Sequence, residues 1–268
     1  MKVAVEKNKK DTILKMEAIN KTFASERHLW NFFQKKFEHK VLKNCSLNVK
    51  SGEIFGLVGL NGIGKTTLIK IILDILDADS GVVKLFGIDS KNAEARKQVC
   101  YLPEKFLPSR YLTGYEFLSL SQSFFGKKLD KSKANKIAEK LDLDCNVLNG
   151  LVKNYSKGMG QKLGLMSCLL SEAKLLILDE PVSGLDPKAR FILKQALKDY
   201  VKDGKSIFLS SHLLDDVEEM CDSMAVLSDG KIAFTGSPKD FRKKFVADTA
   251  EQSFLKCIKF KYFNFSHS

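Results

Sequence analysis

A glycine-rich segment carries a lysine and two threonines at a spacing suited to holding phosphate. Residues 59–67 read Gly-Leu-Asn-Gly-Ile-Gly-Lys-Thr-Thr and fit the pattern G-x-x-x-x-G-K-[ST] of nucleotide phosphate loops. The Lys65 ammonium is expected to reach the β- and γ-phosphates, and the Thr66 hydroxyl is expected to hold Mg²⁺. Gly62 is expected to let the backbone close around the phosphates. The residues expected to contact nucleotide share this loop: Gly59, Asn61, Gly62, Gly64, Lys65, Thr66 and Thr67.

Two neighbouring carboxylates follow an apolar run further along the chain. Residues 175–178 predict a buried strand that delivers Asp179 to the Mg²⁺ ion at the γ-phosphate. Glu180 is placed to take a proton from an attacking water, a role that typically contributes about 10²–10⁴-fold in rate. His212 follows a second apolar strand and is expected to hydrogen-bond the γ-phosphate. The predicted catalytic residues are therefore Glu180, His212 and Lys65.

The elements that must position these side chains alternate between strands and helices. Strand patterns are expected at 13–19, 42–49, 54–58, 82–86, 99–102, 175–178, 207–209 and 224–227. Helical patterns are expected at 67–73, 113–141, 159–170, 187–200 and 213–221. This alternation predicts an α/β fold with a largely parallel sheet. The helical stretch that starts at Thr113, where Glu116 completes a capping box, interrupts the rhythm and predicts a subdomain.

The overall composition of the chain limits the classes of protein to which it can belong. The chain has 268 residues, of which 44% are hydrophobic, so we expect a globular fold. No apolar stretch approaches the length of a membrane span, and the N-terminus lacks a signal-like apolar region, which predicts a soluble cytoplasmic chain. The six cysteines form no C-x-x-C pair and are expected to be buried, reduced thiols rather than metal ligands. The net charge of +12 suits nucleic acid, an anionic membrane surface or plain solubility.

A second anion site is predicted outside the phosphate loop. Residues 155–163 read Tyr-Ser-Lys-Gly-Met-Gly-Gln-Lys-Leu, and Ser156 and Gly158 open a helix whose N-terminus can bind phosphate. One chain already has its phosphate loop, so a second site invites the ATP of another subunit. Together with the phosphate loop, the carboxylate pair and His212, this segment resembles the ABC-type ATPases. The resemblance covers nearly the whole chain.

The resemblance implies a fold and a set of site residues. It implies an ATPase domain over 11–245, with a P-loop core, an antiparallel β subdomain and a helical subdomain at about 104–170, followed by a C-terminal tail at 246–268. It implies that Phe23 stacks on adenine. Ser156 and Gly158 would contact the γ-phosphate bound by a second ATP-binding subunit, and 183–186 would form the D-loop between subunits. Glu104 replaces the family's usual glutamine, and its carboxylate would approach Mg²⁺ through water, beside Thr66 and Asp179.

The variant motifs look like the exporter branch of this family, which handles drugs or polysaccharides. The branch implies a homodimer of ATP-binding subunits on the cytoplasmic face of the membrane, attached peripherally to a separate transmembrane permease, with no nucleic acid. The groove for a short permease helix would come from five residues, which could instead pack within the helical subdomain: Phe106, Leu107, Tyr111, Leu112 and Phe117.

Other interpretations remain open from the sequence. A soluble ABC-type ATPase could act on ribosomes or DNA without transport, and a non-hydrolysing module is disfavoured because both Glu180 and His212 are present. The segment 24–40 is longer than in most family members and carries Trp30 among several phenylalanines and lysines, which predicts an extended hairpin or a contact to membrane or partner. The end of the chain at 259–263 is expected to fray.

Overall fold

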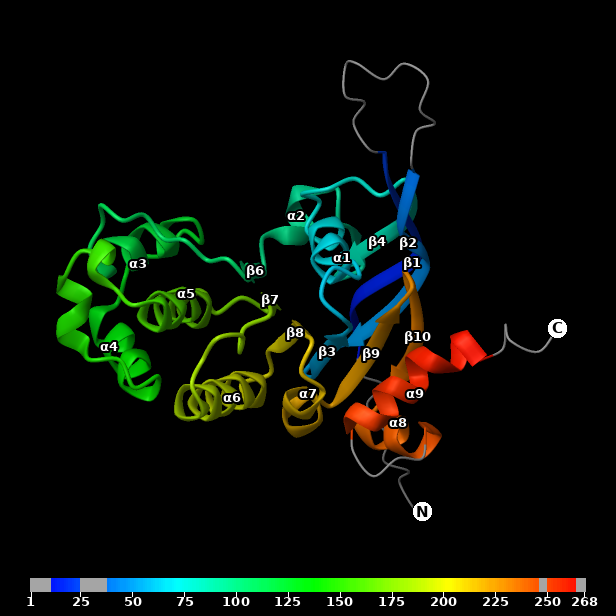
Figure 1. Cartoon of the computed structure of the whole chain (residues 1–268). Coiled ribbons are helices and arrows are strands. Elements are labelled where there is room, and N and C mark those ends of the chain that lie inside the picture. Colours follow the sequence, from blue (N-terminus) through cyan, green and yellow to red (C-terminus); the bar gives the residue numbers. More distant parts are fainter. Residues whose placement is uncertain (1–10, 25–37, 246–249, 264–268) are drawn as a thin grey trace, which may run out of the picture.

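A largely parallel sheet of six strands lies at the centre of the computed structural model, which describes residues 11–24, 38–245 and 250–263 (Figure 1). Its strand order is β10-β9-β3-β8-β7-β6, and β10 runs antiparallel to β9. Because β8 lies between β3 and β7, the carboxyl ends of these three parallel strands meet at one edge. The strands are β3 (Ile54–Val58), β6 (Val99–Leu102), β7 (Leu175–Asp179), β8 (Ser206–Ser211), β9 (Ser223–Ser228) and β10 (Lys231–Gly236).

A second, antiparallel sheet packs over one face of the central sheet. Its order is β2-β1-β4-β5, and its strands are β1 (Thr12–Ala24), β2 (Glu38–Lys50), β4 (Ser80–Leu85) and β5 (Ile88–Asp89). Ala24 pairs with Glu38, as a hairpin requires, while residues 25–37 with Trp30 lie outside the described residues. Both β1 and β2 are longer than the strands predicted from the sequence, because the hairpin pairing continues past their apolar segments.

Two distinct hydrophobic cores lie on opposite faces of the central sheet. Along β3, Phe55 and Leu57 pack with the antiparallel sheet and α1 (Lys65–Ile72), whereas Ile54 and Val58 pack with the helices of the other face. This alternation follows from the period of two along a strand. The helices of that second face include α5 (Lys157–Ser171), α6 (Pro187–Lys202) and α7 (Leu214–Met220).

The expected helical subdomain is built from α3 (Gly114–Ser123), α4 (Lys131–Lys140) and α5, with 3₁₀ turns at Cys145–Asn149 and Val152–Asn154. It lies at the far side of the molecule from the antiparallel sheet (Figure 1). The capping box of Thr113 and Glu116 is confirmed. The single helical stretch predicted at 113–141 is wrong, because Gly126 turns the chain with φ of +67° and Asp130 caps a new helix.

The sequence patterns did not predict five elements of the structure. They are β5, β10, α2 (Ala93–Arg96), α8 (Pro238–Phe245) and α9 (Ala250–Phe263). The fraying expected at 259–263 is wrong, since α9 continues to Phe263. All six cysteines are free thiols, although Cys145 and Cys221 are only half-buried rather than fully buried. Among the described residues, none of the helices has the length and apolar character needed to span a bilayer.

Candidate active site

The phosphate loop connects the end of β3 to the start of α1. Gly62 and Gly64 have φ angles of +77° and +114°, in the left-handed region that favours glycine. A Cβ added to Gly64 would lie 2.7 Å from Val41 Cγ1, so β2 also excludes a side chain there. A Cβ at Gly62 would meet open space, so its backbone conformation, rather than crowding within the chain, is what requires glycine.

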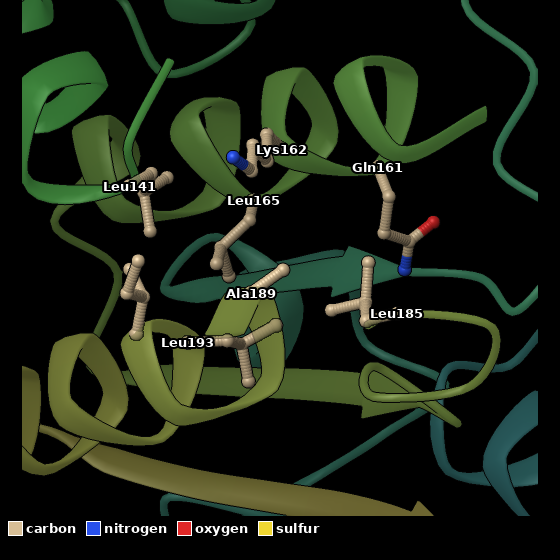
Figure 2. A pocket seen from close by; sticks show the side chains of 8 residues that line it. Leu141, Gln161, Lys162, Leu165, Leu185, Ala189 and Leu193 are labelled. Atoms are coloured by element: carbon tan, nitrogen blue, oxygen red, sulfur yellow. The ribbon is translucent and has the colours of Figure 1, made fainter. Parts of the chain in front are cut away.

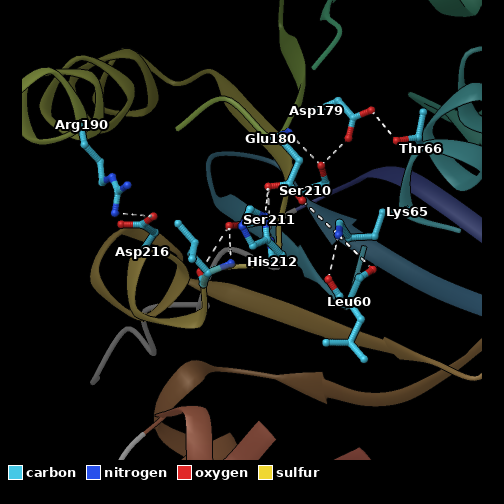
Figure 3. A network of polar contacts seen from close by, with 12 residues as sticks. Leu60, Lys65, Thr66, Asp179, Glu180, Arg190, Ser210, Ser211, His212 and Asp216 are labelled. Atoms are coloured by element: carbon cyan, nitrogen blue, oxygen red, sulfur yellow. Dashed lines mark hydrogen bonds and ion pairs between the residues drawn. The ribbon is translucent and has the colours of Figure 1, made fainter. Parts of the chain in front are cut away.

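Lys65 is held beneath this loop by backbone and carboxylate oxygens (Figure 3). Its Nζ donates to the carbonyl oxygens of Gly59 and Leu60 at 2.7 and 3.3 Å. The same Nζ lies 3.0 Å from Glu180 Oε1, and both side chains are only 6% exposed. A buried pair of opposite charges is stable only while both partners are present. Lys65 and Glu180 therefore neutralise one another in this state.

A hydroxyl and a carboxylate meet beside that pair, between α1 and β7. The Thr66 hydroxyl donates to Asp179 Oδ2 at 2.7 Å, and the Ser210 hydroxyl donates to Asp179 Oδ1 at 2.5 Å. Within the described residues no group of three or more His, Cys, Asp or Glu side chains could hold a metal. Mg²⁺ nevertheless suits this pair, because it prefers oxygen ligands and is usually bound through one or two carboxylates, waters and phosphates. Thr66 and Asp179 thus fit the predicted ion.

Glu180 is fixed by contacts on its backbone and its carboxylate. Its φ of +49° is unusual for a residue other than glycine, and such conformations cluster at functional sites. The Glu180 N–H donates to Ser210 Oγ at 2.9 Å. His212 approaches Glu180 Oε2 with Nδ1 at 2.7 Å and with its backbone N–H at 3.3 Å (Figure 3). The structure therefore brings the three predicted catalytic residues, Lys65, Glu180 and His212, into one cluster.

Glu104 lies at the margin of this cluster. It is exposed and follows the end of β6. Burial, and then the negative charges of Asp179 and Glu104, raise the pKa of Tyr101 to about 12. Glu104, like Asp179, is thus near enough to the Tyr101 phenol for its charge to act there. This placement agrees with an approach of Glu104 to the metal through water, which stays a prediction.

Three predicted site residues lie apart from the cluster. Ser156 is exposed and caps α5, where its hydroxyl accepts the N–H of Met159 at 3.2 Å. Gly158 is half-buried in the first turn of the same helix. The helix therefore starts two positions earlier than the predicted 159, at Lys157. Phe23 is 41% exposed near the end of β1, and the Lys21 ammonium lies 5.5 Å from the centre of its ring.

A cavity of about 610 Å³ opens between the phosphate loop and the start of β2. Its lining includes Asn61 and Gly62 of the loop and His39, Lys40 and Val41 of β2. His39 is the register partner of Phe23, so the predicted adenine-stacking ring lies across the hairpin from this lining. The cavity thus extends from the loop toward the strand pair that carries Phe23.

A much smaller cavity of about 10 Å³ marks the boundary between the helical subdomain and α6 (Figure 2). It is lined mostly by apolar side chains, including Leu165 of α5 and Leu193 of α6, while Gln161 projects at one end. A space of this size holds at most one water molecule. It marks where α5, which Ser156 caps, packs against α6, which follows residues 183–186.

Sequence reasoning missed the part played by Ser210. Ser210 bonds both Asp179 and the backbone of Glu180, so one hydroxyl on β8 organises both carboxylate residues. The only signal in the sequence is its position at the end of an apolar strand. It also missed the charged contacts between α6 and α7, where Arg190 faces Asp216 (Figure 3).

The sequence of this chain is similar to those of known ATP-binding proteins. The family described as "ABC transporter" matches residues 42–183. An uncharacterised ABC transporter ATP-binding protein of Nostoc is 40% identical over 200 residues, which cover 73% of this chain and 59% of that protein. A similar protein of Synechocystis is 37% identical, with 73% and 56% covered. The Nod factor export ATP-binding protein I of Burkholderia orbicola is 32% identical, with 76% and 69% covered. The chain thus spans a little over half the length of the first two relatives.

Solved structures share the fold. The ATP-binding subunit of an ABC transporter superposes with a TM-score of 0.77 and 28% identity, covering 92% of this chain and 99% of that one. A dimeric ATP-binding cassette in a post-hydrolysis state with ADP and Pi has a TM-score of 0.73 and 22% identity, covering 84% and 98%. The expected P-loop core, antiparallel sheet and helical subdomain are therefore confirmed. The chain belongs to the ABC transporter family of ATP-binding proteins.

Proposed function

We propose that this chain hydrolyses ATP to drive export through a separate transmembrane permease, at the cytoplasmic face of the membrane. The observation that carries the proposal is the buried contact of Lys65 with Glu180, beside the Thr66–Asp179 pair and His212. Such a cluster offers a cation for phosphate, oxygen ligands for Mg²⁺ and a carboxylate for proton transfer. Hydrolysis of ATP by water to ADP and phosphate needs all three.

Binding of ATP is proposed to separate Lys65 from Glu180. The triphosphate competes for the Lys65 ammonium, which now lies 3.0 Å from Glu180 Oε1. Glu180 Oε1 then becomes free to accept the proton of the attacking water, while Glu180 Oε2 stays bonded to His212. Thr66 and Asp179 would hold Mg²⁺, which would neutralise charge on the phosphates when bound. The carboxylate is thus released for catalysis only when its substrate is bound.

A second ATP-binding subunit is proposed to complete the site. Phe23 and the cavity beside the phosphate loop accept the nucleoside of the chain's own ATP. Ser156 and Gly158 lie outside the Lys65 cluster, on the N-terminus of α5, where they can contact the γ-phosphate of a second subunit. In a homodimer, the Lys65 cluster of each chain would meet the N-terminus of α5 of the other chain, in keeping with the dimeric cassette that shares the fold.

The permease is proposed to dock on the helical subdomain. Of the five residues expected at this groove, Leu107 and Tyr111 are each 89% exposed. Phe106 and Phe117 instead contact each other edge to face, with ring centres 5.6 Å apart, so they form the floor. Exposed apolar side chains over a packed aromatic floor are typical of a docking surface. Export, rather than import, is supported by the Nod factor export relative.

The Glu180→Gln variant tests the hydrolytic part of the proposal. It removes the proton acceptor while keeping the shape of the side chain, so steady-state hydrolysis should fall by about 10²-fold or more. Binding of a fluorescent ATP analogue should be retained. Glu139→Gln, on the exposed surface of α4, is the matched control and should hydrolyse ATP at the wild-type rate. Near-normal turnover by Glu180→Gln would remove Glu180 from the role of base.

Affinity purification from detergent-solubilised membranes of the native cell tests the transport part. Tagged protein should recover a stoichiometric chain with several membrane spans. A variant carrying both Leu107→Asp and Tyr111→Asp should lose that chain while keeping its own ATP binding. Recovery of ribosomes or nucleic acid instead, with no membrane chain, would contradict the transport proposal and favour a soluble ATPase.

A further inference from the structure

A cluster of charged side chains joins α6 to α7 beneath the active site. Lys194 Nζ of α6 lies 2.7 Å from Asp216 Oδ1 of α7 and also pairs with Glu219 of α7. Arg190, one turn earlier on α6, faces Asp216 Oδ2 with its Nη1 at 3.8 Å (Figure 3). The side chains of Lys194 and Asp216 are only 8% and 5% exposed. The central ion pair is therefore almost wholly removed from water.

The two helices both originate in the candidate active site. α7 begins at Leu214, two residues after His212. α6 begins at Pro187, at the end of the segment that leads away from Glu180, where Asp186 caps it by accepting the N–H of Ala189 at 2.8 Å. The two segments are therefore joined at two places. Before the helices begin, His212 contacts Glu180, and within the helices, Lys194 of α6 contacts Asp216 of α7.

The chemistry of this pair is poorly suited to stability alone. Burying two charges is expensive, and apolar residues of similar volume often hold two elements together at least as well. Asp216 Oδ2 and Arg190 Nε are buried without a hydrogen-bond partner. What an ion pair adds over apolar contacts is a fixed relative position, because its attraction depends on distance and direction.

Lys194 also stays charged despite its burial. Burial by itself lowers the pKa of the ammonium, but the hydrogen bonds and charges of Asp216 and Glu219 outweigh it, and the pKa lies above its ordinary value. The attraction across the two helices is therefore present throughout the neutral range.

We propose that Lys194 and Asp216 are positioning residues for the reaction, which fix α7 against α6 so that His212 remains within hydrogen-bond distance of Glu180. The inference rests on the proposed function for its kinetic consequence, but its structural consequence does not. Neither side chain touches the phosphate loop residues, and each acts through the helix that carries it. A displacement of a catalytic group by about 1 Å can cost up to about 10²-fold in rate.

The decisive variant is the double change Lys194→Met with Asp216→Asn, which removes both charges of the buried central pair. The two charges that lose a partner, Arg190 and Glu219, have side chains that are 35% and 50% exposed. We expect kcat for ATP to fall by about ten-fold or more, with KM and analogue binding changed less than about two-fold. Lys194→Arg keeps the charge and should retain most of the wild-type kcat. Lys202→Met is the matched control, because Lys202 lies on the same helix and pairs with Asp199 at the surface, 75% and 50% exposed.

A spectroscopic measurement separates positioning from mere stability. In ¹⁵N-histidine NMR spectra, the Nδ1 signal of His212 reports its hydrogen bond to Glu180, and it is assigned among the four histidines with His212→Ala. The double variant should shift this signal, whereas Lys202→Met should not. An unshifted His212 signal would overturn the proposal, whether kcat were unchanged or had fallen together with thermal stability. Because the spectrum needs no ATP, it remains a test even if the wild-type protein proves to have no ATPase activity.

Discussion

At the scale of single residues, the candidate site works because each reactive atom is held by a specific second atom. The two oxygens of Asp179 are divided between Thr66 and Ser210, and the two oxygens of Glu180 are divided between Lys65 and His212. A carboxylate restrained at both oxygens presents a defined orientation to an incoming ligand. Removing any one of these partners should therefore have a distinct effect on metal, nucleotide or water.

Ser210→Ala should weaken Mg²⁺ binding while leaving the metal ligands themselves in place. The variant deprives Asp179 Oδ1 of a donor and the Glu180 N–H of an acceptor. Loss of such an outer partner typically lowers metal affinity by about 10–100-fold. The Mg²⁺ concentration for half-maximal ATPase activity should rise accordingly. Ser206→Ala is the control, because Ser206 lies on the same strand but accepts the N–H of Gly52, at the opposite end. If Ser210→Ala and Ser206→Ala needed the same Mg²⁺ concentration for half-maximal activity, the role given to Ser210 would be contradicted.

The sequence predicted the individual members of this cluster better than their contacts. Lys65, Thr66, Asp179, Glu180 and His212 were all identifiable because motif and strand position together define their chemistry. The pairing of Lys65 with Glu180 depends on β3, β8 and β7 lying side by side, and strand order is not written in any local pattern. The sequence therefore identified the members of the cluster, whereas their contacts with one another follow from the strand order.

At the scale of elements, α5 connects the second predicted anion site to the segment around the end of β6. It begins at Ser156, and further along its length it packs against the segment that follows β6. The approach is so close that a Cβ added to Gly164 would lie 2.7 Å from both Leu102 Cδ1 and Phe106 Cδ1. The position of α5 is therefore tied to the segment that contains Glu104.

Gly164→Ala should destabilise the protein through this contact. Inserting a methyl group into a filled interior typically costs about 1–3 kcal/mol in the free energy of unfolding. Gly160→Ala is a matched control on the same helix, since a Cβ there meets nothing within 4 Å. Because alanine has the higher helix propensity, Gly160→Ala should instead stabilise by up to about 1 kcal/mol. Urea unfolding of both variants measures the difference, and an equal effect of the two would contradict this packing.

Glu172 at the end of α5 should make stability depend on pH. Its hydrogen bonds with Lys127 and Lys133 lower the pKa of the carboxyl from 4.5 to about 2. Because the folded-state pKa is the lower one, the stabilisation is present above pH 4.5 and is lost as the pH falls toward 2. Glu172→Gln should lower the melting temperature at neutral pH, and this gap should narrow in acid. The pairs are half-exposed, so the effect should stay below about 1 kcal/mol. A gap independent of pH would exclude this origin.

Helix starts were predicted more accurately than helix connections. Thr113 and Ser156 cap α3 and α5 through side-chain chemistry that is local in sequence. The break between α3 and α4 depends on the left-handed turn at Gly126, and a single glycine within a helical pattern does not reveal it. β10 packs against α8 through Phe234, which contacts both Phe241 and Phe245, and no local sequence pattern shows this tertiary contact.

At the scale of the whole molecule, the two predicted phosphate sites lie on different parts of the fold. The Lys65 cluster lies at the edge of the central sheet, whereas Ser156 and Gly158 lie on the helical subdomain (Figure 1). One chain thus carries the groups predicted to bind ATP and, apart from them, a second predicted phosphate site. Association of two copies, head to tail, would bring the two kinds of site together around two nucleotides.

The most direct test of the account is the molar mass of the Glu180→Gln protein by light scattering, in Mg-ATP and in ADP. We expect the mass of two chains in Mg-ATP, because ATP is held but not hydrolysed, and the mass of one chain in ADP. Adding Ser156→Arg, which blocks the phosphate site at the start of α5, should restore the single-chain mass in Mg-ATP. A single-chain mass with ATP demonstrably bound would contradict the shared site on which the proposed function depends.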